Sequence, residues 1–95
     1  MLLDIGGDVG ALVVTAPEAL TGVEVGIRPA GSVDRSGHPE HVAVVRRPVA
    51  GRPVPSLVFG ALSAGTYELF RLPDGPGVLT VAVAGGRVTE AAWPD

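Results

Sequence analysis

The sequence predicts an all-β fold, a seven-stranded Greek-key β-sandwich. Runs rich in β-branched residues recur about every ten residues, with Gly, Pro, Ser and Asp between them. Several runs alternate apolar and polar residues, the pattern of a strand with one buried face. No segment has a convincing helical period, and 17–21 could form a single turn at most. A chain of 95 residues fits one domain, 1–95.

The segment 57–70 is the most informative stretch, because it predicts a strand, a tight corner and a second strand. Four large side chains have the spacing that points them to one face: Leu57, Phe59, Tyr67 and Leu69. Gly60 and Gly65 flank the corner, where a residue without Cβ adopts positive φ at no steric cost. The two strands are therefore expected to share one core.

The other strands are predicted in the same way. With a short lead-in at 2–5, the expected strands are 10–16, 23–28, 41–47, 55–59, 66–72, 78–84 and 87–93. The strand 23–28 alternates most clearly, with Val23, Val25 and Ile27 expected inward and Glu24 and Arg28 in water. The buried set is expected to be Val13, Val23, Val25, Ile27, Val42, Val44, Leu57, Phe59, Tyr67, Leu69, Leu79, Val81 and Val83.

Turn residues set the connections. Pro48 is expected to end the strand 41–47, and 49–53 is expected to form a hairpin turn. Pro53 and Pro55 mark the next strand as an edge or a strand start, because proline lacks a backbone donor. The pair Gly85-Gly86 suits a two-residue turn and predicts a closing hairpin. The polar loop 29–40 is long for a β-protein, so it is expected to be either mobile or functional.

Composition excludes several classes of protein. There is no cysteine, so disulfides and thiolate chemistry are absent. Ten acidic residues against seven arginines give a net charge of −3, which repels duplex nucleic acid. The first residues carry no base ahead of an apolar run, unlike a secretory signal, and no apolar stretch reaches the roughly 20 residues that a membrane span needs. We expect a cytoplasmic protein that binds neither nucleic acid nor membrane.

Three phrases in the chain resemble a known family. Leu20-Thr21-Gly22-Val23-Glu24-Val25 fits a "G-V-x-V" start of a strand, and 59–67 fits "F-x-x-L-x-x-G-x-Y". Together with 85–90, these resemble the prealbumin-like sandwich of carboxypeptidase regulatory-like and transthyretin-like domains. The resemblance implies that the seven-stranded Greek key is of the prealbumin-like or immunoglobulin-like type. The segment 3–14 is also similar to the start of small stand-alone actinobacterial proteins of unestablished role. The resemblance implies an architecture and no activity, since the Tyr-Arg-Gly-Ser-like tail of the transthyretin-like hydrolases is not matched.

One cluster carries ligand-type side chains. His38-Pro39-Glu40-His41 offers two imidazoles and a carboxylate, which suit Zn²⁺ or Cu²⁺, and Asp34 lies upstream. Pro39 forces an extended conformation at His38, and further ligands must come from elsewhere. The competing interpretation is a pair of solvated loop histidines. Catalysis is not expected, because no Gly-x-Ser-x-Gly phrase is present and 5–10 lacks the strand–helix context of phosphate-binding glycines.

Two further features concern partners. Arg46, Arg47 and Arg52 fall on neighbouring positions of one predicted hairpin, where they either discourage sheet-to-sheet aggregation or dock an acidic surface. Trp93 either caps the open end of the core or serves as an interface anchor. The leading hypothesis is a non-enzymatic interaction module without cofactor, which binds a protein partner or self-associates through an edge strand. The alternative is a metal-binding protein that uses His38 and His41.

Overall fold

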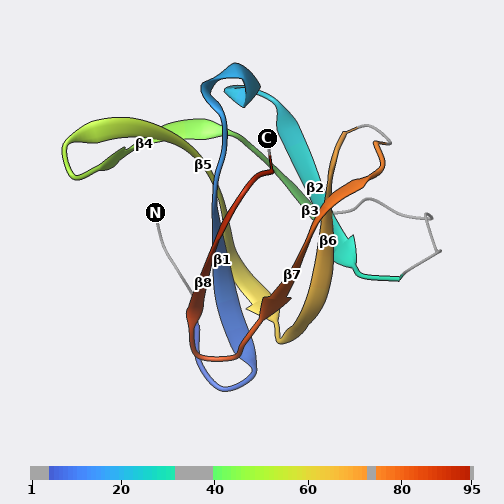
Figure 1. The fold of residues 1–95 in the computed structure, drawn as a ribbon. Coiled ribbons are helices and arrows are strands. Elements are labelled where there is room, and N and C mark those ends of the chain that lie inside the picture. The colour runs from blue at the N-terminus through green and yellow to red at the C-terminus, as the bar shows by residue number, and fades with distance from the viewer. Residues whose placement is uncertain (1–4, 32–39, 73–74, 95) are drawn as a thin grey trace.

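Two β-sheets of four strands each face one another as a sandwich in the computed structural model (Figure 1), which describes residues 5–31, 40–72 and 75–94. The elements are β1 (Val9–Thr15), the 3₁₀ turn η1 (Glu18–Leu20), β2 (Glu24–Pro29), β3 (Glu40–Ala43), β4 (Val45–Val49), β5 (Arg52–Ser63), β6 (Gly65–Arg71), β7 (Gly77–Val83) and β8 (Val88–Ala92). One sheet has the order β4-β5-β1-β8 and the other β3-β2-β6-β7. The all-β sandwich is confirmed, with eight described strands where seven were predicted.

The extra strand arises at Val44. The predicted strand 41–47 is wrong, because β3 and β4 belong to different sheets. Val44 is 1% exposed; its N–H donates to the Val23 carbonyl at 2.9 Å and its carbonyl accepts from Gly22 N at 2.8 Å. Val44 is the one residue between β3 and β4, and the chain passes there from one sheet to the other. Pro48 does not end a strand either, since it lies inside β4 opposite Pro53.

A tight corner joins β5 to β6 as predicted, but it lies at Ala64 between Ser63 and Gly65, and Gly60 does not flank it. Leu57, Phe59 and Leu69 are fully buried, and Tyr67 packs half-buried against the same core. The Tyr67 hydroxyl donates to the Ser63 carbonyl at 2.6 Å and so ties β6 to the end of β5. The other corner residue predicted, Gly60, lies inside β5 where the β1–β5 register shifts, and its φ is not positive.

The buried face of β1 is the opposite of the predicted one. Leu12 and Val14 are 0% exposed and belong to the core, whereas Val13 is half-buried on the outside of the sheet, opposite Val58. Residues 11–14 are all apolar, so alternation could not select a face. The rest of the core cluster consists of Val25, Ile27, Val44, Leu57, Phe59, Leu62, Leu69, Val83 and Trp93. The other predicted core residues pack half-buried against it: Val23, Val42, Tyr67, Leu79 and Val81.

The predicted closing hairpin is wrong. β7 and β8 lie in different sheets, and β8 pairs in parallel with β1, from Ala11 opposite Val88 to Thr15 opposite Ala92. Glycine is needed at position 85 for a steric reason and not for a hairpin turn. A Cβ atom there would lie 2.2 Å from the Gly7 carbonyl oxygen. The turn is therefore packed tightly against the segment that precedes β1.

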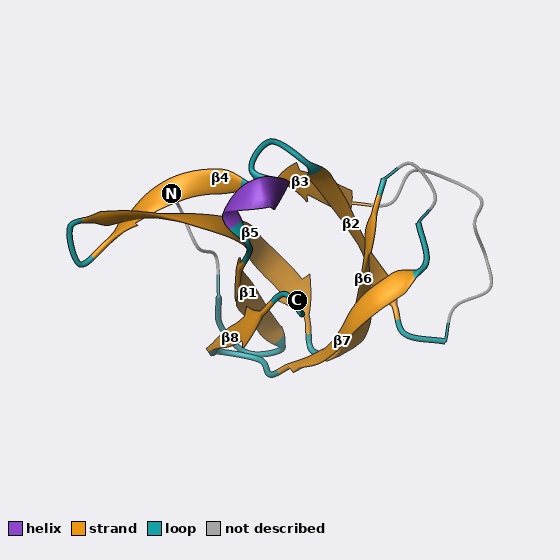
Figure 2. Ribbon diagram, turned by 45° about the horizontal axis from the view of Figure 1, so that its top comes forward, coloured by secondary structure: helices purple, strands orange, loops and turns teal. Residues whose placement is uncertain are grey.

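One hairpin extends past the sandwich. β5 pairs with β1 only over 56–63, and the Pro55 carbonyl accepts from Ala16 N at 3.0 Å, while 52–54 pair with β4 alone. Figures 1 and 2 show β4 and the first part of β5 projecting to the left of the two sheets. We call residues 45–55 the hairpin arm. None of the helical structure in the described part of the chain has the length or hydropathy of a membrane span.

Candidate protein-binding surface

The hairpin arm is built around a two-residue turn. Ala50 and Gly51 both have positive φ, 51° and 80°, and the turn joins the opposed residues Val49 and Arg52. Such a primed turn matches the natural twist of two antiparallel strands. Its flanking pair is hydrogen-bonded, and bonded and non-bonded pairs then alternate along the ladder. The alternate, non-bonded positions hold all three prolines of the arm: Pro48, Pro53 and Pro55. The arm is thus a regular ladder in spite of its prolines.

The pairing sorts the side chains of the arm onto two faces, because opposed residues of neighbouring strands point the same way. The first, which we call the outer face, holds Val45, Arg47, Val49, Arg52 and Val54. The second holds Arg46, Pro48, Pro53 and Pro55. Val45 and Val49 are 47% and 53% exposed, which makes them the most exposed large apolar side chains among the described residues. The outer face therefore offers aliphatic surface beside cations.

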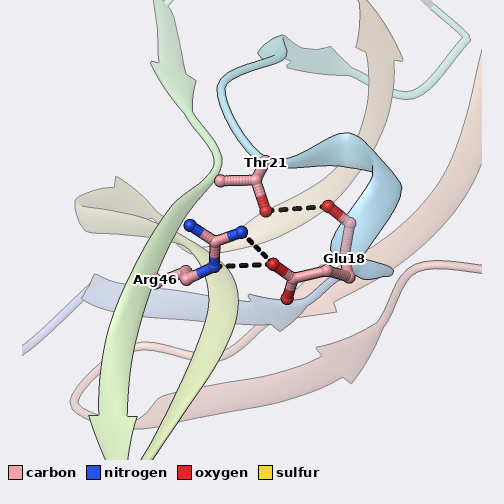
Figure 3. A network of polar contacts seen from close by, with 3 residues as sticks. All are labelled: Glu18, Thr21 and Arg46. Atoms are coloured by element: carbon pink, nitrogen blue, oxygen red, sulfur yellow. Dashed lines mark hydrogen bonds and ion pairs between the residues drawn. The ribbon is translucent and has the colours of Figure 1, made fainter.

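Arg46 faces the body of the protein. Its Nε and one terminal nitrogen both bind a single carboxylate oxygen of Glu18, with the Nε contact at 2.6 Å (Figure 3). Glu18 lies in η1, and the Thr21 hydroxyl donates to the Glu18 carbonyl at 2.8 Å. Both charged side chains are more than half exposed, so this ion pair orients the arm more than it stabilises the fold.

Arg47 lies on the other face and is held by the backbone. One terminal nitrogen donates to the Ser56 carbonyl at 2.5 Å and to the Ser56 hydroxyl at 3.1 Å, and contacts the Val45 carbonyl at 3.3 Å. Ser56 itself is buried and pairs with both Val45 and Thr15. Arg47 therefore fixes the base of the arm while its charge remains at the surface.

Arg52 is exposed near the tip, and its side chain makes no hydrogen bond or ion pair with any residue that the structure describes. It shares the outer face with Arg47, opposite Val49. The three arginines predicted as one cluster are thus on one hairpin but not in one patch. Arg46 pairs with Glu18 on one face, and Arg47 and Arg52 lie on the other.

Charge is distributed unevenly along the chain. Residues 41–67, which contain the whole arm, carry three of the seven arginines and none of the ten acidic residues. The remaining segments hold four arginines against all ten acids, although the net charge of the whole chain is −3. The arm is the basic part of an acidic protein, and a positive patch of this kind attracts a partner of opposite charge.

Trp93 is not part of this surface. It is 8% exposed and belongs to the core cluster, and its backbone N–H donates to the Thr15 carbonyl at 2.8 Å. In Figure 1 the C-terminal end lies between the two sheets. Of the two predicted roles, the structure supports the one in which Trp93 caps the core.

The histidine cluster is described only in part. His38 lies outside the described residues, and His41 is exposed on β3 with Nε2 3.7 Å from Glu24 Oε1. Within 5–31, 40–72 and 75–94, no three residues of the His, Cys, Asp or Glu type come together as metal ligands. A metal site at His38 and His41 stays a prediction.

The opposite sheet carries a second arrangement that the sequence did not predict. Arg28 was expected in water, but its side chain is only 12% exposed and its guanidinium lies 4.1 Å from the centre of the Phe70 ring. Arg28 Nε also donates to Glu68 Oε1 at 2.7 Å. Because the cation already has an anion and an aromatic partner, it has no unused charge for a ligand.

No known protein family matches this chain, and no curated protein and no solved structure is significantly similar to it.

Proposed function

We propose that this protein is a non-enzymatic interaction module that binds an acidic protein partner through the outer face of the hairpin arm. The exposure of Val45 and Val49 carries the proposal, because two large aliphatic side chains project into water on a ladder held in place at its base. A protein interface typically combines an apolar centre with charged residues at its rim. Arg52 and Arg47 supply that charge here.

The partner is expected to present acidic side chains beside aliphatic ones. The absence of acids in 41–67 favours a negative surface over a second acidic copy of the chain. Docking is expected on the outer face and not along the β4 edge, because Pro48 lacks the donor that an added strand would need. We also propose the prealbumin-like Greek key as the fold type, on the resemblance of 20–25 and 59–67 to that family.

Selection from displayed random peptides on the immobilised protein tests the proposal. We expect enriched peptides that combine Asp or Glu with aliphatic residues, and an affinity that falls as salt screens the charges. The substitution Arg52→Glu should weaken binding of such a synthetic peptide at least about tenfold. The Arg52 side chain makes no hydrogen bond or ion pair with the described residues, so we expect its charge reversal to leave the fold intact.

Arg87→Glu is the matched control, since it makes the same charge change at another exposed position outside the arm. It should leave peptide affinity close to that of the wild type. Equal losses for Arg52→Glu and Arg87→Glu would show a general charge effect and remove the proposal. Enrichment of neutral or basic peptides would remove it as well.

A further inference from the structure

We infer that two copies of this chain pair through the free edge of β7 and form one continuous eight-stranded sheet. This inference does not depend on the proposed function, because β7 lies in the sheet that does not contain the arm. The residues that carry it are Thr80, Val81 and Ala82.

β7 is the least protected of the four edge strands. It has seven residues, Gly77–Val83, with no proline and no charged side chain. Each other edge has a feature that opposes strand addition: β4 contains Pro48, β8 is short and contains Glu90, and β3 has four residues and begins at Glu40. A long, uncharged edge is the kind to which a further strand adds most readily.

The hydrogen-bond pattern fixes which groups face the open side of β7. Ala30 N donates to the Thr66 carbonyl at 3.0 Å and Leu72 N to the Glu24 carbonyl at 3.1 Å, so the even-numbered residues of β6 bond toward β2. The odd-numbered residues therefore bond toward β7, where Tyr67 is opposed to Val81.

It follows that Thr80 and Ala82 direct their N–H and C=O groups away from β6. Across the described ranges, none of these groups has a hydrogen bond outside the β6–β7 ladder. Both side chains are exposed, and neither stands at the register shift at the start of the strand. A row of four unpaired backbone groups is thus presented to the surroundings.

The core beneath this edge is incompletely covered. Leu79 and Val81 point inward and pack against the core cluster, yet both remain only half-buried. An added strand whose inward side chains are aliphatic would cover them. A second β7 meets this requirement, because it brings its own Leu79 and Val81.

One antiparallel register satisfies all of these groups with two-fold symmetry. Thr80 of each copy then faces Ala82 of the other, which gives four backbone hydrogen bonds, and the two Val81 side chains meet on the axis. β7 contains no charged residue, so the pairing brings no like charges opposite one another.

Disulfide trapping tests this register, since the chain contains no cysteine of its own. In the Val81→Cys variant the two cysteines fall at a non-hydrogen-bonded pair, with Cα atoms about 4.5 Å apart, which is within the range of a disulfide. Mild oxidation should convert most of this variant to a covalent dimer. Val88→Cys is the matched control, because position 88 is 42% exposed on β8, and it should form little covalent dimer.

Sedimentation equilibrium of the unmodified protein provides the second readout. We expect a reversible dimer that added salt leaves unchanged or strengthens, since each copy carries a charge of −3, whereas binding at the arm weakens with salt. Thr80→Pro removes an outward N–H without touching the β6–β7 ladder and should weaken the dimer at least about tenfold. A wild type that stays monomeric at high concentration, or Val88→Cys that crosslinks as fast as Val81→Cys, would overturn the inference. So would a monomer that takes up an unrelated extended peptide at β7.

Discussion

Gly26 lies directly against the ring of Phe70, and a Cβ atom at position 26 would be 2.6 Å from Phe70 Cζ. Phe70 is 3% exposed although it does not belong to the central core cluster. Its ring is enclosed between β2 on one side and the guanidinium of Arg28 on the other. Gly26 is therefore the residue that allows an aromatic ring to lie flat on the outside of this sheet.

We predict that Gly26→Ala destabilises the protein by about 1–3 kcal/mol, because the new methyl group displaces the ring. Chemical denaturation measures this change in the free energy of unfolding. The double variant Gly26→Ala with Phe70→Leu supplies the control. Part of the loss should disappear in the Phe70→Leu background, and a fully additive pair would contradict the contact.

A second prediction concerns the face of β1. Leu12→Ala should cost about 2–5 kcal/mol, because Leu12 is fully buried in the core between the sheets. Val13→Ala, one residue away, should cost about 1 kcal/mol or less, since Val13 is half-buried on the outside. Thermal and urea unfolding of both variants measures the difference. Equal costs, or a larger cost at position 13, would reverse the assignment of the two faces.

The turn of the hairpin arm gives a third prediction. Ala50 has φ of 51°, a conformation that costs a residue with Cβ about 1 kcal/mol. Ala50→Gly should therefore raise the free energy of unfolding by a few tenths to about 1 kcal/mol. Ala61→Gly, the same substitution inside β5, should lower it by about 0.5–1 kcal/mol. Opposite signs at the two positions are the expected result, and a loss at both would argue against the primed turn.

The two arginine–glutamate pairs are predicted to differ in strength. A double-mutant cycle on Arg46 and Glu18, both more than half exposed, should give a coupling energy of about 0.5 kcal/mol or less. The cycle on Arg28 and Glu68, 12% and 29% exposed, should give about 1–2 kcal/mol, because this pair is partly desolvated. High salt should weaken the first pair more than the second. Equal coupling energies would contradict the difference in burial.

The sequence predicts the fold class and the corner at Tyr67 because both depend on local patterns. Alternation and turn residues are enough to place most strands and to identify most of the aliphatic core. They fail at β1, where residues 11–14 are apolar on both faces. They also fail at 41–47 and 85–86, because no local signal distinguishes a chain that crosses between sheets from one that continues or folds back.

The candidate surface is predicted only in part, for a related reason. The spacing of Arg46, Arg47 and Arg52 places them on one hairpin, but which face each occupies depends on the register between β4 and β5. Exposure of Val45 and Val49 was not predicted, since aliphatic residues in a strand normally indicate a buried face. The three prolines at 48, 53 and 55 were the available signal, because each lacks the N–H that pairing with a further strand would use.

Amide chemical-shift changes on titration with a selected acidic peptide test the central claim most directly. If the arm is the binding surface, the shifted amides cluster at Val45, Val49, Arg52 and Val54, with smaller changes at Ser56 where Arg47 is anchored. The chemical shifts of the β6 and β7 amides should not change. A cluster at His41 and Glu24, or along β7 with the arm unchanged, would contradict the account.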